Sequence, residues 1–460
     1  MNLVDALRQK DSRTQNGAVT HSTSLSYLVD LFFMAGASRN KPEYEIESLL
    51  TKAFNENVEL ATKLVFWAGD IRGGAGERRF FQLALKFIKE NYNKIYEDNI
   101  DNVPFYNRYD SLFQFTDKTT FDFLHTCLAN GDSLLAKWLP REGKAKHQKF
   151  LKEFREYIEL SPKSYRKLVA GLSKTVEQDL SARRFTSINY SHVPSVAFSK
   201  YKRAFRRNDE EGFSTFLDKV QSGEAKVNAG AIFPHDIYRT LFNDVTASVA
   251  QWNALPNYME NSSERILPVC DVSGSMHGTP MEISIALGLY ISERNTGTFK
   301  DCFMTFSESP RMYKLQGDLV QRANDLNRAE WGYNTNLQAL FRTILMAATN
   351  NNIPEEEMPT TVLIISDMEF DQACKHTNLE AIQLAYISAG YTIPKLVFWN
   401  VNSVSNSNLP ARFNEEGVGL VSGASPSVIK AVLSGEISPD KVMLRTINDP
   451  RYDKIIVDIE

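Results

Sequence analysis

The stretch RILPVCDVSGSM (residues 265–276) has the pattern of a buried β-strand that passes directly into a short polar loop. Similar apolar runs follow it, and helical stretches with apolar residues three and four positions apart alternate with them. The further strand runs are residues 300–307, 360–368, 395–401 and 417–423, and the helical ones are 281–294, 336–350, 379–390 and 425–435. Continuous apolar strands that alternate with helices predict an α/β doubly wound domain with a mainly parallel sheet.

The chain before residue 256 has a different pattern of apolar residues. It contains amphipathic helical patterns separated by short Gly, Pro and Ser breaks, such as residues 38–42 and 73–76. Helices of similar length joined by short turns are typical of stacked helix pairs, although no strict repeat period is visible. The helical runs are residues 44–56, 59–71, 79–92 and 147–160. We therefore predict a helical domain over residues 1–255 and an α/β domain over residues 256–460.

Oxygen-bearing side chains gather at the ends of the predicted strands. Asp271, Ser273 and Ser275 occupy alternate positions of the loop after residues 265–270, while Thr335 precedes a helix and Asp367 ends the run TVLIIS. Ligands of such sheets bind beyond the carboxyl ends of the strands. Oxygen donors without His or thiolate suit Mg²⁺ first, with Ca²⁺ or Mn²⁺ as alternatives. A site with so few carboxylates leaves positive charge on the ion, which would attract an acidic partner. The alternative is a purely structural role, in which Asp271 and the serines cap the next helix.

The charges of the two halves differ. Residues 1–262 carry 36 basic and 32 acidic side chains, whereas residues 263–460 carry 16 and 24. Within the first half, residues 137–207 have 18 basic against 6 acidic side chains, with aromatics interleaved, which is typical of a polyanion-binding surface. The predicted phosphate contacts are Arg183, Arg184, Lys200, Lys202, Arg203, Arg206 and Arg207, and neighbouring aromatics are candidates for base stacking. The alternative is that these residues form the solvated faces of helices whose aromatics build the core.

Several classes of protein are excluded by what the sequence does not contain. Its first twenty residues hold no apolar signal segment, and no run is long and apolar enough to span a membrane. The four cysteines are far apart and form no CxxC pair. The glycine-rich residues 72–78 do not match the phosphate-binding loop GxxxxGK[ST], and a helix-to-helix turn is the better interpretation. We therefore expect a cytoplasmic protein without a membrane partner.

The set Asp271-x-Ser273-x-Ser275 with Thr335 and Asp367 resembles the metal-ion-dependent adhesion site (MIDAS) of von Willebrand factor A domains. The resemblance implies that the hydroxyls of Ser273, Ser275 and Thr335 contact the ion. It also implies that Asp271 and Asp367 contact it directly or through water.

The wider chain, over roughly residues 24–435, is similar to a family known only as a domain of unknown function and found in plants, fungi, bacteria and phages. The resemblance is carried by DIRGGAGERRFF (70–81), LLAKWLPRE (134–142), residues 165–205, GEAKVNAGAIFPHDI (223–237), VCDVSGSM (269–276), ISDMEFDQA (365–373), LVFWNVN (396–402) and GVGLVSGASPSVIK (417–430). That family is similar in architecture to the Ro (TROVE-type) class, in which a ring of HEAT-like helical repeats joins a von Willebrand A domain. The Ro class binds misfolded or single-stranded RNA ends through its ring and small structured RNAs along a basic outer surface. Because the helical half is shorter than a full Ro ring, the sequence leaves its closure open.

The leading hypothesis is a non-enzymatic, Ro-like ribonucleoprotein component that binds RNA with its helical domain and an acidic protein ligand at the metal site. A metal-dependent scaffold or adaptor without nucleic acid is the first alternative. A Mg²⁺-dependent phosphoesterase is the second, with Glu369 or Asp371 as the nearest candidates for a general base.

Overall fold

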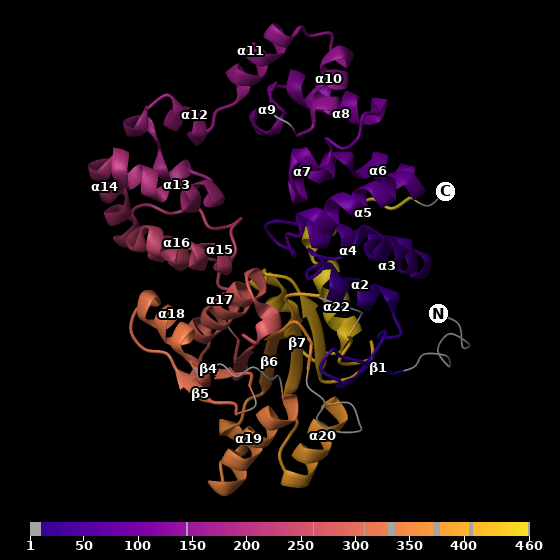
Figure 1. The fold of residues 1–460 in the computed structure, drawn as a ribbon, viewed down its shortest axis with the longest axis vertical. Coiled ribbons are helices and arrows are strands. Elements are labelled where there is room, and N and C mark those ends of the chain that lie inside the picture. Colours follow the sequence, from indigo (N-terminus) through magenta and orange to yellow (C-terminus); the bar gives the residue numbers. More distant parts are fainter. Residues whose placement is uncertain are drawn as a thin grey trace.

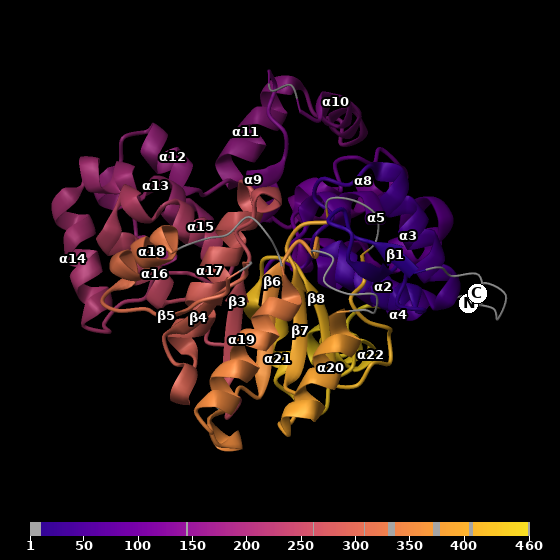
Figure 2. The ribbon, with the colours of Figure 1, turned by 60° about the horizontal axis from the view of Figure 1, so that its bottom comes forward.

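A helical arc stands on an α/β sheet domain. The computed structural model describes residues 11–458, apart from residues 144–145, 261, 308, 330–335, 371–377 and 404–407. In Figure 1 the helices run from one side of the sheet, over the top and down to its other side. Figure 2 shows α2–α5 and α13–α16 on opposite sides of the sheet. Thr335 and Asp371, which the sequence singles out, lie outside the described residues.

The first helices of the arc pack against one another and against the sheet domain. They are α2 (Tyr27–Ala35), α3 (Glu43–Glu56), α4 (Val58–Gly69), α5 (Arg78–Asn91), α6 (Asn93–Asn99) and α7 (Val103–Tyr106). Side-chain caps begin two of them: Ser26 accepts from the amide of Val29, and Asn57 from that of Leu60. Because α2 contacts β8 and α22 as well as α3 and α4, the arc and the sheet share one hydrophobic core.

The helices of the arc contribute to two separate hydrophobic cores. The helices α8 (Lys118–Ala129), α9 (Ser133–Trp138), α10 (Gln148–Tyr157) and α11 (Pro162–Leu172) continue the first core. Beyond them come α12 (Val176–Ser181), α13 (Ser195–Asn208), α14 (Glu210–Gln221), α15 (Pro234–Arg239) and α16 (Val245–Asn253). Phe198, Phe205 and Phe213 lie in a second, separate cluster between α13 and α14. The arc therefore has a separate core around α13 and α14, whereas Ile237 of α15 and Trp252 of α16 return to the first core.

The two ends of the arc meet above the sheet. A Cβ built on Gly76, in the turn after α4, would lie 2.6 Å from the ring of Phe233, which immediately precedes α15. Helix α15 also packs on α17 (Thr279–Arg294), the first helix of the sheet domain. The turn after α4 and the segment before α15 therefore lie next to each other, which brings the two sides of the arc together above the sheet.

The sheet has six strands in the order β5-β4-β3-β6-β7-β8. The strands are β3 (Ile266–Cys270), β4 (Cys302–Thr305), β5 (Met312–Lys314), β6 (Thr361–Ser366), β7 (Lys395–Asn400) and β8 (Val418–Ser422). All neighbours are parallel except β4 and β5. This is the doubly wound order, whose switch point falls between β3 and β6. The accompanying helices are α17, α18 (Leu319–Arg328), α19 (Leu337–Asn350), α20 (Asn378–Ala389), α21 (Ile429–Val432) and α22 (Pro439–Ile447).

Both ends of the described chain pack against the opposite half. A hairpin of β1 (Asp11–Arg13) and β2 (Val19–His21) reaches the sheet domain, where His21 bridges to Leu409. In return, Asn99 in α6 exchanges hydrogen bonds with Ile456 through both backbone groups of that residue (2.6 and 2.9 Å). The two halves are thus tied at both ends.

The predicted fold class, a helical repeat-like domain followed by a mainly parallel α/β domain, is confirmed. Strand β5 and helices α18 and α22 were not among the predicted elements. None of the helices in the described residues is long and apolar enough to cross a membrane.

Candidate functional site

The topological switch point of the sheet holds two of the predicted metal ligands. Asp271 follows β3 directly and Asp367 follows β6 directly, and these strands are parallel neighbours with Cys270 opposite Ile365. Residues after such a pair emerge at the same edge of the sheet, on either side of the crevice where ligands bind. The fold therefore places both carboxylates in one site.

The loop after β3 is shaped by its own side chains. The amide of Ser273 donates to Asp271 Oδ1 (2.8 Å), and the hydroxyls of Ser273 and Ser275 lie 3.1 Å apart. The hydroxyl of Ser366, the last residue of β6, donates to Asp271 Oδ2 (2.6 Å). The Asp271 carboxylate is completely buried and oriented from two sides, while Ser275 is exposed at the rim. The sequence had not indicated a role for Ser366.

Two buried carboxyl groups, Asp271 and Asp367, lie close enough in this site for their charges to repel. Burial, together with the nearby charge of Asp367, raises the pKa of Asp271 to about 7. Burial also raises the pKa of Asp367, whose Oδ2 is buried and accepts no hydrogen bond from the described residues. Two buried carboxylates beside two serine hydroxyls fit a hard divalent cation, which would remove the repulsion and engage the orphaned oxygen. The described residues contain no cluster of three or more His, Cys, Asp or Glu, and the serine hydroxyls are further oxygen donors beside the two carboxylates.

The loop after β6 is held by distant segments. Glu369 is 3% exposed, and its carboxylate accepts from the amide of Gln15 (2.7 Å) and from Asn408 Nδ2 (2.9 Å). The hairpin adds a bond from Asn16 Nδ2 to the Glu369 carbonyl (2.8 Å) and one from Thr14 Oγ1 to the Phe370 carbonyl (2.5 Å). Because its carboxylate is occupied by these donors, Glu369 positions the loop next to Asp367. Sequence reasoning missed this role, since nothing in the local pattern links residues more than 350 positions apart.

The basic residues of α13 divide into two groups. Lys202 has no exposed surface, and its Nζ donates to Ser248 Oγ (2.6 Å) and Thr240 Oγ1 (3.0 Å). Burial lowers the pKa of Lys202 to about 8. The prediction that Lys202 contacts phosphate is therefore wrong, because its ammonium group faces the core between α13 and α16. Arg206 is partly exposed and pairs with Asp244 (2.9 Å).

The remaining basic residues of α13 surround a hollow on the surface. Lys200, Arg203 and Arg207 are exposed, and with Arg206 they line a depression of about 560 Å³ that Ala204 and Asn243 complete. We call Lys200, Arg203, Arg206 and Arg207 the α13 patch. The lining contains four cationic side chains and no carboxylate. Because Arg206 is paired with Asp244, the excess positive charge of this surface comes from Lys200, Arg203 and Arg207.

The rest of the predicted basic surface is less uniform. Arg183 and Arg184 are exposed near the end of α12, where Arg184 pairs with Asp179 (2.7 Å). Helix α11 adds three exposed cations that the sequence analysis had not singled out: Lys163, Arg166 and Lys167. Their spacing around the buried Tyr165 and Val169 was the available signal. Most interleaved aromatics belong to the cores, since Phe150, Phe154, Tyr165, Tyr190, Phe198 and Phe205 are all buried.

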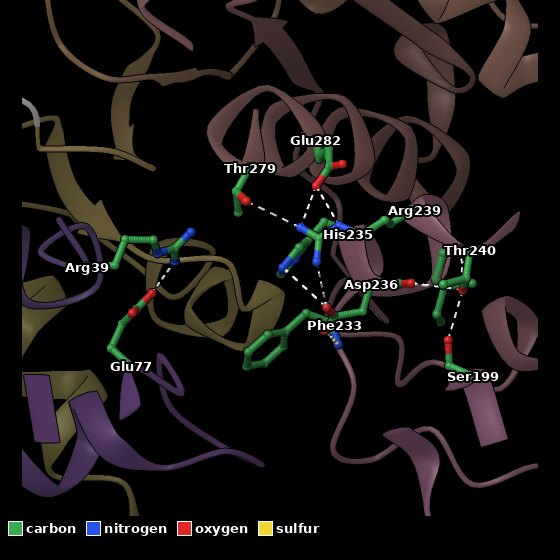
Figure 3. A network of polar contacts seen from close by, with 11 residues as sticks. Arg39, Glu77, Ser199, Phe233, His235, Asp236, Arg239, Thr240, Thr279 and Glu282 are labelled. Carbon is green, nitrogen blue, oxygen red and sulfur yellow. Dashed lines mark hydrogen bonds and ion pairs between the residues drawn. The ribbon is translucent and has the colours of Figure 1, made fainter. Parts of the chain in front are cut away.

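A polar network joins the end of the arc to α17, the helix that follows the loop after β3 (Figure 3). Arg239 in α15 forms an ion pair with Glu282 and donates to Thr279 Oγ1 (3.4 Å), both in the first turns of α17. His235 lies within the same network, 3.6 Å from Asp236, and burial lowers its pKa to about 4. The imidazole is therefore neutral at pH 7. The network fixes the arc against the helix that starts three residues after Met276.

The same arrangement of helical arc and sheet domain occurs in the crystal structure of the Ro (RSR) protein of Deinococcus radiodurans. The two superpose with a TM-score of 0.51 and 15% sequence identity, over 92% of this chain and 99% of that chain. The fold is therefore Ro-like, a helical repeat domain joined to a von Willebrand A-like domain.

Residues 14–105 and 111–265 match the family described as Domain of unknown function (DUF2828), and residues 265–452 match Domain of unknown function (DUF7788). The first match covers more than half of the chain, and the chain belongs to the DUF2828 family. "Uncharacterized protein L728" of Acanthamoeba polyphaga mimivirus is 28% identical over 513 aligned positions, which cover 98% of this chain and 89% of that protein.

Proposed function

We propose that this protein is a Ro-like RNA-binding protein whose helical arc binds the phosphates of RNA, while its sheet domain holds a divalent cation that takes an acidic protein ligand. The proposal of RNA binding rests on the α13 patch, in which four cations line one hollow that contains no carboxylate. Exposed cations on α11 and Arg183 add further positive charge to the helical arc.

Phosphate chemistry explains why this arrangement suits RNA. Arg presents a planar fork of donors to phosphate oxygens, and Lys adds a mobile point charge. Binding to several phosphates releases condensed counterions, which supplies affinity without base contacts. The sheet domain carries the excess of acidic residues, so the two ligands belong to separate halves.

The metal half rests on the buried carboxylate pair. Asp271 and Asp367 would hold the ion together with the hydroxyls of Ser273 and Ser275, and Mg²⁺ is the first choice, with Ca²⁺ or Mn²⁺ as alternatives. The bound ion would supply positive charge at the exposed rim beside Ser275, where a carboxylate of a protein partner completes its coordination. The role proposed for the site is binding and not catalysis, because Glu369, the nearest described candidate for a general base, already accepts two hydrogen bonds.

RNA crosslinking tests the first half. The full-length protein is irradiated in cells and purified, and the crosslinked RNA is compared with that of a Lys200→Glu, Arg203→Glu, Arg207→Glu variant. The matched control reverses three exposed lysines elsewhere: Lys52, Lys300 and Lys314. We expect RNA with the parent and the control but not with the patch variant. In a salt titration on single-stranded RNA, loss of three phosphate contacts lowers the slope of log K against log salt by about 2. Equal RNA recovery from all three proteins would refute the proposal.

Terbium luminescence tests the second half and separates it from the scaffold alternative. Tb³⁺ binding should be competed by Mg²⁺, Ca²⁺ or Mn²⁺ and should disappear with Asp271→Asn, while circular dichroism stays unchanged. If Asp271→Asn binds Tb³⁺ as tightly as the parent, the ion does not lie between these carboxylates. If the metal binds but no RNA is recovered from the parent, the adaptor function without nucleic acid replaces the leading one.

A further inference from the structure

A hollow of about 440 Å³ lies where the helical arc meets the sheet domain, away from both the metal loop and the α13 patch. Its walls come from the glycine-rich turn after α4, from Tyr258 in the linker, from α21, and from the segment of α22 and the residues that follow it. The loop that leads to α21 leaves the carboxyl end of β8 at Ser422. The hollow therefore lies on the side of the sheet where α/β domains bind their ligands.

The lining of this junction hollow is strongly basic. It contains Arg72, Lys430, Arg445 and Arg451, against the single carboxylate of Asp449. These cations come from segments far apart in the sequence, and the fold brings them to one place. The carboxylates of Asp449 and of Asp70, which pairs with Arg451, offset part of this charge, and the remaining excess of positive charge would attract an anion.

Two of the four cations are fixed and two are available. Arg451 makes an ion pair with the fully buried Asp70, and Arg445 donates to backbone carbonyls, including that of Ala431 (3.1 Å). Within the described residues, Arg72 and Lys430 have no carboxylate partner, and both are exposed. The Arg72 guanidinium donates one hydrogen bond to the Phe105 carbonyl (3.2 Å), so its remaining N–H groups are the ones that would reach a ligand. The hollow thus combines a rigid basic wall with two cations that can close on an anion.

An aromatic ring forms the remaining wall. Tyr258 borders this hollow and a second one of about 570 Å³, which is also lined by Lys430, Ser434, Glu260 and Glu264. The Lys430 ammonium group lies 5.3 Å from the centre of the Tyr258 ring. A planar group stacked on this ring would have the basic hollow on one side and the polar one on the other. The combined shape suits a ligand with an anionic end, an aromatic middle and hydrogen-bonding groups beyond it.

We propose that the junction hollow binds a mononucleotide, with its phosphate between Arg72 and Lys430 and its base against Tyr258. Its volume lies within the range of about 300–1,000 Å³ that is usual for small-ligand sites. The two phosphate-binding cations come from opposite halves of the molecule, Arg72 from the arc and Lys430 from the sheet domain. A bound mononucleotide therefore ties the halves together and stabilises the folded protein by mass action.

Calorimetry with adenosine 5′-monophosphate tests this site on the full-length protein. We expect saturable binding and a higher melting temperature, with at least tenfold weaker binding of adenosine, because it lacks the phosphate. The Arg72→Gln, Lys430→Gln double variant should lose at least tenfold in affinity, whereas Lys441→Gln, at an accessible lysine of α22 outside the hollow, should match the parent. The site does not depend on RNA binding, so the triple variant of the α13 patch should bind the nucleotide normally.

Three results would overturn the inference: no saturable binding at millimolar nucleotide, equal binding of adenosine and its monophosphate, or unchanged affinity of the double variant. Because neither Arg72 nor Lys430 is buried, misfolding is not expected to obscure the result. Thermal unfolding of the double variant without ligand verifies this.

Discussion

Replacing Lys202 by Met isolates the energetic role of the buried ammonium group in α13. Burial lowers the pKa of Lys202 from 10.5 to about 8. Between these values the unfolded chain binds more protons than the folded protein, so the free energy of unfolding rises with pH across this window. Below pH 8 the folded protein bears the full penalty of a buried charge, about 3 kcal/mol at 1.36 kcal/mol per pKa unit. From pH 7 to pH 9 the linkage relation gives the parent a gain of about 1.3 kcal/mol that the Met variant lacks.

The assay is urea unfolding followed by far-ultraviolet circular dichroism at pH 7, 8 and 9. Other titrating groups are common to parent and variant and cancel in the difference. Lys200→Met, at an exposed position of the same helix, is the matched control and should leave the pH dependence unchanged. Lys202→Met should also keep its RNA binding, whereas Lys200→Met should weaken it. Parallel pH profiles for parent and Lys202→Met would refute the reasoning.

Three further substitutions probe the packing of the two halves. Asp70→Asn leaves Arg451 without its buried carboxylate and should cost about 3 kcal/mol of unfolding free energy, measured by chemical denaturation, with the exposed Asp453→Asn as control. Gly36→Ala should cost at least about 2 kcal/mol, since its Cβ would lie 2.6 Å from the backbone of β8's following residue, Gly423; an unchanged melting temperature would contradict this contact. At Gly171, within α11, an added Cβ would have no neighbouring atom within 4 Å. Gly171→Ala should therefore raise the free energy of unfolding by about 0.5 kcal/mol, seen as a higher melting temperature.

The parts of the fold that the sequence predicts are those with a complete local signal. Strands β3, β6 and β8 are buried along their whole length and appear as continuous apolar runs. Strand β5 has three residues with mixed exposure at the sheet edge, which leaves no such run. The approach of Gly76 to Phe233 depends on how the whole arc curves, and no local pattern encodes it.

The candidate site shows the same division. Asp271 and Asp367 could be placed together because both end apolar strand runs, and the doubly wound topology makes those strands neighbours. The hydrogen bonds that hold Glu369 could not be predicted, since their donors are Asn408, 39 residues away, and residues of a hairpin more than 350 residues away. Lys202 was misassigned although a signal existed: it stands four residues after Phe198 and three before Phe205, on the buried face of α13. A positive charge alone therefore does not predict exposure; the position of the residue on the helix does.

The return of the C-terminal segment to the first helices bears on how the protein is made. The carboxylate of Asp70 meets Arg451 and Tyr452, and Asn99 meets Ile456, across separations of more than 350 residues. Because chains emerge from the ribosome from the N-terminus onward, Asp70 and Asn99 meet these partners only after more than 350 further residues have been synthesised. Asp70 meanwhile stays in water, where an unpaired carboxylate is stable, and leaves it only when the guanidinium group arrives. The junction hollow, whose walls include Arg451 and Tyr452, thus cannot form on a newly synthesised chain until this later segment has emerged.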